Sequence, residues 1–128
     1  FPDWFPTLAH IAEAPLPDQQ LDGINLGGLI QGKDAPPRDK AMIWDFHNYG
    51  GIVAIRDGRW KALRRGLLNK KQPQAWELYD LDADCNETRN LATKHPDIVR
   101  RLEKAWLTER TVEPDFPVPL VDGKTAIE

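Results

Sequence analysis

The sequence predicts an α+β fold: a small antiparallel sheet of about four strands with a C-terminal helix packed on one face, preceded by a helical segment. The first observation is Asp57-Gly58, a pair typical of tight hairpin turns, between two strand-like runs. The second is a further alternating run at residues 76–81. The third is an apolar stripe with helical spacing that begins at Pro96.

The hairpin is the most clearly specified element. A type I′ turn centred on Asp57-Gly58 would place Ile55 opposite Trp60 and join strands at residues 52–56 and 59–64. Successive side chains of a strand point to opposite faces, so the apolar and the basic residues separate. One face then holds Val53, Ile55, Trp60 and Ala62, and the other holds Ala54, Arg56, Arg59 and Lys61. We expect the first face to be buried, with Trp60 as its anchor.

The remaining strands and the C-terminal helix complete the subdomain. Residues 41–46 predict the first strand and residues 76–81 the last. The helix is expected at about residues 96–109, with Pro96 in its first turn, where an N–H group is not needed. Its apolar stripe consists of Ile98, Leu102, Ala105 and Trp106. Residues 111–128 contain prolines and no periodicity, so they predict an extended tail that is ordered only where it packs on something.

A helical segment precedes the sheet. Residues 1–13 predict a helix that ends before Pro15, and one or two further helical turns are expected before Gly32. The first helix carries an apolar face that would need a partner, formed by Trp4, Phe5, Leu8 and Ile11. A polar stretch with Pro36-Pro37 follows, so we place the two domains at residues 1–35 and 36–128.

The composition excludes several classes of protein. A net charge of −3 argues against a nucleic-acid-binding protein, and no apolar run reaches the length of a membrane span. The single cysteine, Cys85, excludes an internal disulfide. The chain starts at Phe1, inside a motif, so we expect a fragment or a processed product.

Five short motifs resemble, in order, the C-terminal part of type I sulfatases. A-I-R-D-G-R-W-K at residues 54–61 and W-E-L-Y-D-L at residues 76–81 are similar to that family's A-V-R-x-G-x-W-K and E-L-Y-D-L strands. D-C-N-E-T-R-N-L at residues 84–91 follows, as D-P-x-E-x-x-N-L does in the family, with cysteine in the place of proline. Upstream, D-W-F-P-T-L at residues 3–8 and L-D-G-I-N-L at residues 21–26 resemble D-L-x-P-T-L and L-D-G-x-S-L.

The resemblance implies a parent enzyme that hydrolyses sulfate esters on a carbohydrate or an aryl group. Residues 1–35 would end its α/β catalytic domain, and residues 36–128 would form a C-terminal subdomain that has this domain as its partner. The parent would use a formylglycine nucleophile and Ca²⁺, both held by the catalytic domain, and would be periplasmic, secreted or lysosomal. No motif for those groups is present in this sequence, so no catalytic or metal-binding residue is carried over. Without the larger domain, the apolar face of the first helix is expected to dock elsewhere or to self-associate.

Two further patterns resemble reactive sites but are better explained as turns. Cys85 and Arg89 have the C-x-x-x-R spacing of the sulfatase modification signature C-x-P-x-R, but Glu87 stands where that signature has proline. The acidic run at residues 80–86 alternates like the start of an EF-hand loop, but Cys85 and Leu91 occupy the positions that need Gly and Glu. We therefore expect a turn cysteine and a strand end that runs into Asx turns.

The best-equipped candidate for a substrate contact is the loop His47-Asn48-Tyr49. His47 and Asn48 can donate or accept hydrogen bonds, and Tyr49 offers a stacking face, while Gly50-Gly51 lets the backbone turn tightly. By the sulfatase resemblance, this loop would reach the rim of the substrate pocket; the alternative is an ordinary surface loop. Two other function classes stay open: a stand-alone carbohydrate-binding or interaction module, and part of a phosphodiesterase or phosphonate hydrolase of the same superfamily.

Overall fold

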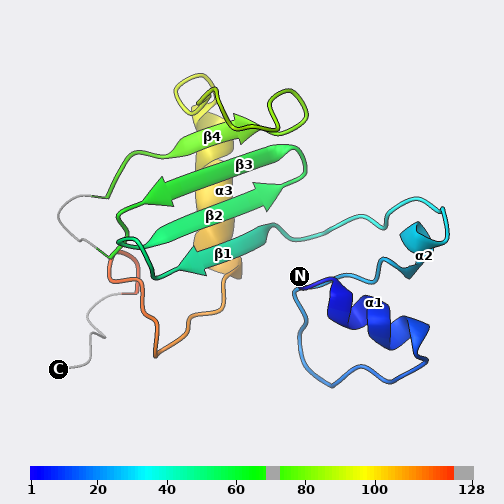
Figure 1. The fold of residues 1–128 in the computed structure, drawn as a ribbon. Helices are drawn as coiled ribbons and strands as arrows, with labels where there is room; N and C mark the ends of the chain where they lie inside the picture. The colour runs from blue at the N-terminus through cyan, green and yellow to red at the C-terminus, as the bar shows by residue number, and fades with distance from the viewer. Residues whose placement is uncertain (69–72, 123–128) are drawn as a thin grey trace. The chain divides into compact units, whose positions relative to one another are not determined.

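A computed structural model describes residues 1–68 and 73–122 of the chain (Figure 1). The chain divides into two compact units, Phe1–Asp39 and Lys40–Glu128. The predicted division lay at residues 35 and 36, and the assignment of the first unit to a catalytic domain stays a prediction. Within the described residues, no helix combines the length and the apolarity that a membrane crossing requires.

The first unit is held together by Thr7 and Asp3. It contains α1 (Trp4–Ile11) and α2 (Gly27–Ile30), as the helical spacing predicted. The Thr7 hydroxyl donates to the Asp3 carbonyl over 2.6 Å and accepts from the Leu26 amide over 2.8 Å. The Asp3 carboxylate accepts from the Ile24 amide over 2.9 Å and from Arg38 over 2.5 Å. These polar contacts fix the segment after α1 against one side of the helix.

Helix α1 also carries an apolar surface that is uncovered within this unit. Its four large apolar side chains are all more than half exposed: Trp4, Phe5, Leu8 and Ile11. The predicted apolar face is therefore present in the first unit. Contiguous apolar surface of this kind is typical of a site that contacts another protein surface.

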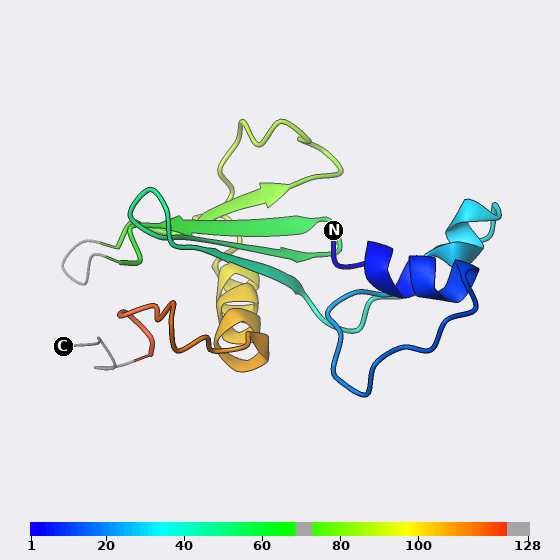
Figure 2. The same ribbon diagram turned by 60° about the horizontal axis from the view of Figure 1, so that its bottom comes forward.

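The second unit is a four-stranded antiparallel sheet with a helix across one face. The strands are β1 (Met42–Phe46), β2 (Ile52–Asp57), β3 (Trp60–Arg65) and β4 (Glu77–Asp80), in the order β1-β2-β3-β4. The helix α3 (Pro96–Glu109) begins with the predicted proline and crosses the strands on one side (Figures 1 and 2). The predicted α+β fold is confirmed.

The register of the central hairpin differs from the prediction. Asp57 pairs with Trp60 and Ile55 pairs with Ala62, so Ile55 does not face Trp60. Gly58 has φ +58°, whereas Arg59 is not among the residues with positive φ, so the two-residue turn is Gly58-Arg59 and is not type I′. A glycine followed by a residue with negative φ is the pattern of a type II′ turn. Each residue's partner moves by two positions, so every side chain keeps its predicted face.

The core is anchored by Trp106 rather than by Trp60. Trp106 and Leu102 are completely buried against the sheet, and Val99, which the predicted stripe omitted, is also buried. Trp60 only packs against the edge of this core and is partly exposed, so its prediction as the anchor was wrong. The physical reason is position: Trp60 lies beside the turn, opposite Asp57, whereas Trp106 lies on α3 within the core cluster.

The tail after α3 packs against the core within its described residues. Val118 is 2% exposed and belongs to the same core as α3 and β2. Figure 2 shows the tail on the side of the sheet that carries α3. The extended tail predicted from its prolines is thus ordered over residues 111–122 because it packs, and residues 123–128 lie outside the described part of the chain.

Candidate functional site

The loop that joins β1 to β2 has a fixed base and an open tip. The Gly51 carbonyl accepts from the Leu67 amide over 3.2 Å, and the Gly50 carbonyl accepts from the Leu68 amide over 3.0 Å. Gly51 has φ +83°, and a Cβ there would lie 2.7 Å from the Leu68 Cγ atom. Only glycine therefore allows this approach, and the loop is tied at its base to the segment that follows β3.

Tyr49 occupies the tip of this loop in an unusual backbone conformation. Its φ is +56°, and its side chain is 93% exposed. The left-handed conformation costs a non-glycine residue roughly 1–2 kcal/mol. The exposed ring recovers none of this energy by burial against the described residues. The predicted substrate contact of Tyr49 stays a prediction, for which this backbone outlier is a reason to test.

His47 and Asn48 are placed differently from each other. The His47 ring is half-buried, with its Nε2 atom 3.2 Å from the Pro117 carbonyl oxygen and its face near the edge of Phe116, at 5.5 Å between centroids. Asn48 is exposed, and its backbone carbonyl accepts from the Gly51 amide over 3.1 Å. The three predicted site residues therefore share one loop, but only Asn48 and Tyr49 reach solvent freely, while His47 also contacts the tail.

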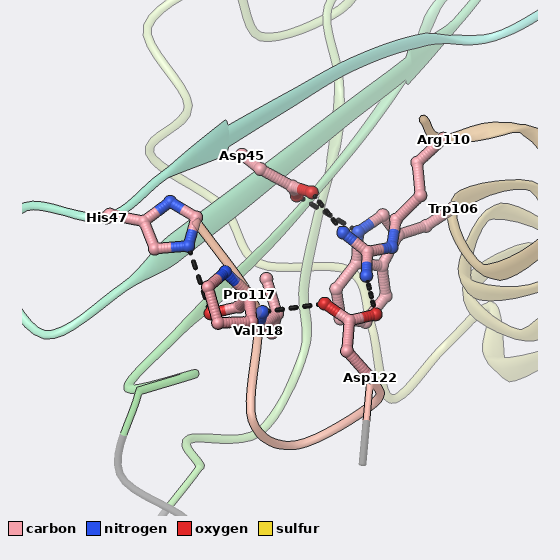
Figure 3. A network of polar contacts seen from close by, with 7 residues as sticks. All are labelled: Asp45, His47, Trp106, Arg110, Pro117, Val118 and Asp122. Carbon is pink, nitrogen blue, oxygen red and sulfur yellow. Dashed lines mark hydrogen bonds and ion pairs between the residues drawn. The ribbon is translucent and has the colours of Figure 1, made fainter. Parts of the chain in front are cut away.

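A buried ionic network lies beside this loop (Figure 3). Arg110, 5% exposed, bridges Asp45 of β1 and Asp122 of the tail. Its guanidinium donates to Asp45 Oδ2 over 2.9 Å, and the Trp106 indole donates to Asp45 Oδ1 over 3.0 Å. Asp122 also accepts from the Val118 amide over 2.7 Å. Removing one partner of such a buried pair is strongly destabilising, because it leaves the other charge uncompensated.

The network shifts the pKa values of Asp122 and Arg110. Burial alone would raise the pKa of Asp122, but hydrogen bonds from Arg110 and from the Val118 amide outweigh it, so the pKa lies below its ordinary value. Burial likewise opposes the charge of Arg110, but the two carboxylates raise the pKa of its guanidinium. Both groups are therefore charged throughout the neutral range.

Sequence reasoning missed this network, although one signal was present. Asp45 stands in a strand whose other residues are apolar, and it falls on the face that α3 covers. A carboxylate on a buried face requires a partner, which predicts a cation or a hydrogen-bond donor nearby. The partner itself could not be named, because Arg110 is 65 residues away along the chain.

The other patterns in the sequence form turns. Cys85 is exposed in a turn. The Asp80 carboxylate pairs with Arg59, and the Asp84 carboxylate accepts from the backbone amides of Thr88 and Arg89, each over 2.8 Å. In residues 1–68 and 73–122, no three His, Cys, Asp or Glu side chains are grouped so that they could hold a metal ion.

The relatives of this chain are sulfatases. No family model matches it. An uncharacterized sulfatase of Schizosaccharomyces pombe is 32% identical over 117 residues, which are 82% of this chain and 20% of that protein. The N-acetylgalactosamine-6-O-sulfatase of Bacteroides thetaiotaomicron is 32% identical over 85% of this chain and 23% of its own length. Human arylsulfatase A is 31% identical over 87% of this chain and 26% of its own length.

Solved structures agree with this relationship. A 2-O GAG sulfatase superposes with a TM-score of 0.64 and 25% identity, over 84% of this chain and 24% of its own. Ps i-CgsB, in complex with k-i-k-neocarrahexaose, superposes with a TM-score of 0.59 and 31% identity, over 81% of this chain and 23% of its own. The chain thus spans about a quarter or less of the length of these proteins. Over more than four fifths of its length this chain is therefore a relative of the sulfatases, and its match is consistent with the C-terminal portion of such an enzyme.

Proposed function

We propose that this chain is the C-terminal portion of a hydrolase that cleaves sulfate esters of a carbohydrate. The observation that carries the proposal is that three relatives named as sulfatases match 82%, 85% and 87% of the chain. One of them is named for a sulfated amino sugar, and the solved structure of Ps i-CgsB holds an oligosaccharide. A sulfated carbohydrate is therefore the substrate class to test first.

The chemistry itself would come from the rest of the enzyme. Among the described residues no carboxylate group is arranged to bind Ca²⁺, and the carboxylates nearest that pattern, Asp80 and Asp84, are already engaged by Arg59 and by backbone amides. Cys85 does not fit a formylglycine precursor either, because Glu87 takes the place of the signature's proline. The Ca²⁺ and formylglycine that the family implies would thus belong to the larger domain, which this chain would complete.

The first unit would provide the contact with that larger domain. The apolar side of α1, with Trp4, Phe5, Leu8 and Ile11 more than half exposed, would be buried against the catalytic domain. Complete burial of an exposed apolar side chain of this size contributes roughly 1.5–3 kcal/mol. The catalytic domain would therefore bury the apolar surface of α1 that is exposed in the first unit alone.

The loop His47-Asn48-Tyr49 would contribute to the rim of the substrate pocket. Tyr49 presents an uncovered ring on which a sugar can stack, and the Asn48 amide can donate to one hydroxyl while accepting from another. Neither group is suited to break a sulfate ester. Their contacts would bind the ground state and the transition state alike, so they would act on KM more than on kcat.

An activity panel on the whole enzyme tests the proposed reaction. The substrates are 6-O-sulfated N-acetylgalactosamine, sulfated glycosaminoglycan oligosaccharides, 4-nitrophenyl sulfate and bis(4-nitrophenyl) phosphate, and the readout is released sulfate or nitrophenol. We expect the highest kcat/KM with a sulfated carbohydrate. Preference for the phosphate diester would favour the phosphodiesterase alternative.

A second measurement tests the alternative of a stand-alone module. Isothermal titration of the 128-residue chain with the same sulfated carbohydrates is expected to show no binding tighter than about millimolar, because a loop at a rim supplies only part of a pocket. Micromolar binding by this chain, combined with an inactive whole protein, would contradict the proposal and favour the module.

A further inference from the structure

We propose that the tail is a positioning element for the substrate loop, in which Arg110 and Asp122 fix the tail and the Pro117 carbonyl then orients the ring of His47. The inference rests on the rim role proposed for the loop. It assigns a task to residues 110–122 and identifies Nδ1 as the atom of His47 that would meet a sulfated sugar. Arg110 and Asp122 are positioning residues in this arrangement, because they touch no substrate.

A continuous series of contacts runs from α3 to the loop (Figure 3). Arg110 follows the end of α3 and pairs with Asp122, and the two side chains are 5% and 8% exposed. Asp122 accepts from the Val118 amide over 2.7 Å, and its own backbone amide donates to the Val118 carbonyl over 2.9 Å. Two hydrogen bonds thus join Val118 and Asp122 across the turn at residues 118–122, and the Val118 side chain is buried in the core. Pro117, the next residue, therefore has a fixed carbonyl.

That carbonyl determines which nitrogen of His47 carries a hydrogen. Nε2 lies 3.2 Å from the Pro117 oxygen, and a carbonyl oxygen can only accept. Nε2 must therefore be the protonated nitrogen whenever this bond exists. Nδ1 has no hydrogen-bond partner among residues 1–68 and 73–122, and Figure 3 shows it on the side of the ring away from Pro117.

The free nitrogen suits a sulfated sugar in either charge state. In the neutral ring Nδ1 accepts from a sugar hydroxyl, and in the charged ring it donates to a sulfate oxygen. Phe116 packs against the ring in a T-shaped arrangement with an interplanar angle of 61°, a contact that would favour one orientation of the imidazole. A side chain whose rotamer is already locked loses less entropy on binding, so the tail would increase affinity without touching the ligand.

A double-mutant cycle in the whole enzyme tests the inference. Asp122→Asn and Phe116→Ala are made singly and in combination with His47→Ala, with the exposed α3 residue Arg100→Ala as the control. Kinetics are measured on the sulfated carbohydrate with the highest kcat/KM and on 4-nitrophenyl sulfate. Asp122→Asn, Phe116→Ala and His47→Ala are each expected to raise KM for the carbohydrate by about threefold to tenfold with kcat nearly unchanged, whereas Arg100→Ala should leave both constants unchanged. In the His47→Ala background the two tail variants are expected to have no further effect, because their effect passes through His47.

The possible failures are distinguishable. If the tail variants raise KM equally in the His47→Ala background, or impair both substrates alike, the tail is only structural and the inference is wrong, while the rim role stands. If His47→Ala leaves KM unchanged but Asn48→Ala and Tyr49→Ala raise it, the inference is also wrong and the rim role survives. If none of the three loop variants changes KM, both fail.

Nitrogen NMR tests the proposed tautomer independently of activity. The chain contains only three histidines, so ¹⁵N-histidine labelling of the 128-residue chain gives a spectrum that single variants can assign. We expect the neutral His47 ring to show the Nε2–H tautomer. Asp122→Asn is expected to move the ¹⁵N chemical shifts of this ring toward those of an imidazole that exchanges between its two tautomers. A neutral His47 ring in which Nδ1 is protonated and Nε2 is unprotonated would overturn the inference.

Discussion

Trp106 and Asp45 are joined across the two layers of the second unit by a hydrogen bond of 3.0 Å from the indole Nε1 atom to the Oδ1 atom of the carboxylate. Trp106 is completely buried on α3, and Asp45 lies on the edge strand β1, two residues before the loop at His47. The same carboxylate receives Arg110 on its other oxygen. One side chain of the sheet therefore fixes both the helix and the start of the tail.

The Trp106→Phe variant is expected to destabilise the chain by about 1–3 kcal/mol, because it removes the indole donor and some packing volume but keeps an aromatic ring. Trp106→Ala should cost about 3–5 kcal/mol. Urea unfolding monitored by circular dichroism measures both. Leu107→Ala, at the neighbouring but exposed position, is the control and should change stability by less than about 0.5 kcal/mol. Equal effects of the changes at 106 and 107 would contradict the assignment of Trp106 as the anchor.

Gly51 and Gly50 form a matched pair for testing the base of the loop. Both have positive φ, of +83° and +80°, but a Cβ at Gly51 would lie 2.9 Å from the Leu68 amide nitrogen, whereas a Cβ at Gly50 meets nothing within 4 Å. Gly50→Ala should therefore cost about 1–2 kcal/mol from backbone conformation alone. Gly51→Ala should cost about 1–3 kcal/mol more, because it also overpacks the site. Thermal unfolding of the two variants decides this, and equal losses would show that the base of the loop is looser than described.

Acid is expected to weaken the contribution of Asp122. Its pKa is lowered in the folded state, so its stabilising effect is fully present above the unfolded value of about 3.9 and is lost as the pH falls through the folded value. Wild type should be more stable than Asp122→Asn at pH 7 and 5, and the difference should shrink below about pH 4. Urea unfolding at pH 7, 5, 4 and 3 measures it. A difference that stays constant or grows toward pH 3 would contradict the ion pair with Arg110.

The apolar side of α1 should make the 128-residue chain associate with itself in solution. Its large side chains are more than half exposed in the first unit, and surfaces of this kind are uncommon on monomers. Sedimentation velocity should show association that increases with concentration and is reduced by Trp4→Ser and Leu8→Ser. Leu107→Ser, an exposed leucine of α3, serves as the control. A single monomeric species at high concentration would argue against this surface as a contact site.

Local signals in the sequence were sufficient for the architecture of the second unit. Asp57-Gly58 marked the hairpin and Pro96 marked the start of α3, because turn chemistry and helix caps act over a few residues. The turn lies one residue later than predicted, because the glycine can serve as either the first or the second central residue, and each strand residue's partner therefore moves by two positions. Faces were still correct, because the alternation of a strand does not depend on which of these turns forms.

Contacts between distant residues could not be read from the sequence. The burial of Trp106 in place of Trp60 depends on where α3 crosses the sheet, which no local pattern determines. The ion pair of Arg110 with Asp45 closes a separation of 65 residues. The loop at residues 47–51 was identified from its residue types alone, but the contact of His47 with Pro117 required the packed tail. Its role at a pocket rim stays a prediction.

Tyr49→Ala in the whole enzyme gives the most direct test of the account, because the ring of Tyr49 is 93% exposed and its removal leaves the fold of the second unit intact. KM and kcat are measured with the best sulfated carbohydrate and with 4-nitrophenyl sulfate. We predict that KM for the carbohydrate rises by about twofold to tenfold with kcat unchanged, and that both constants for the aryl sulfate stay the same. Unchanged constants for the carbohydrate, or an equal loss of kcat on both substrates, would contradict the proposal that this loop selects the substrate.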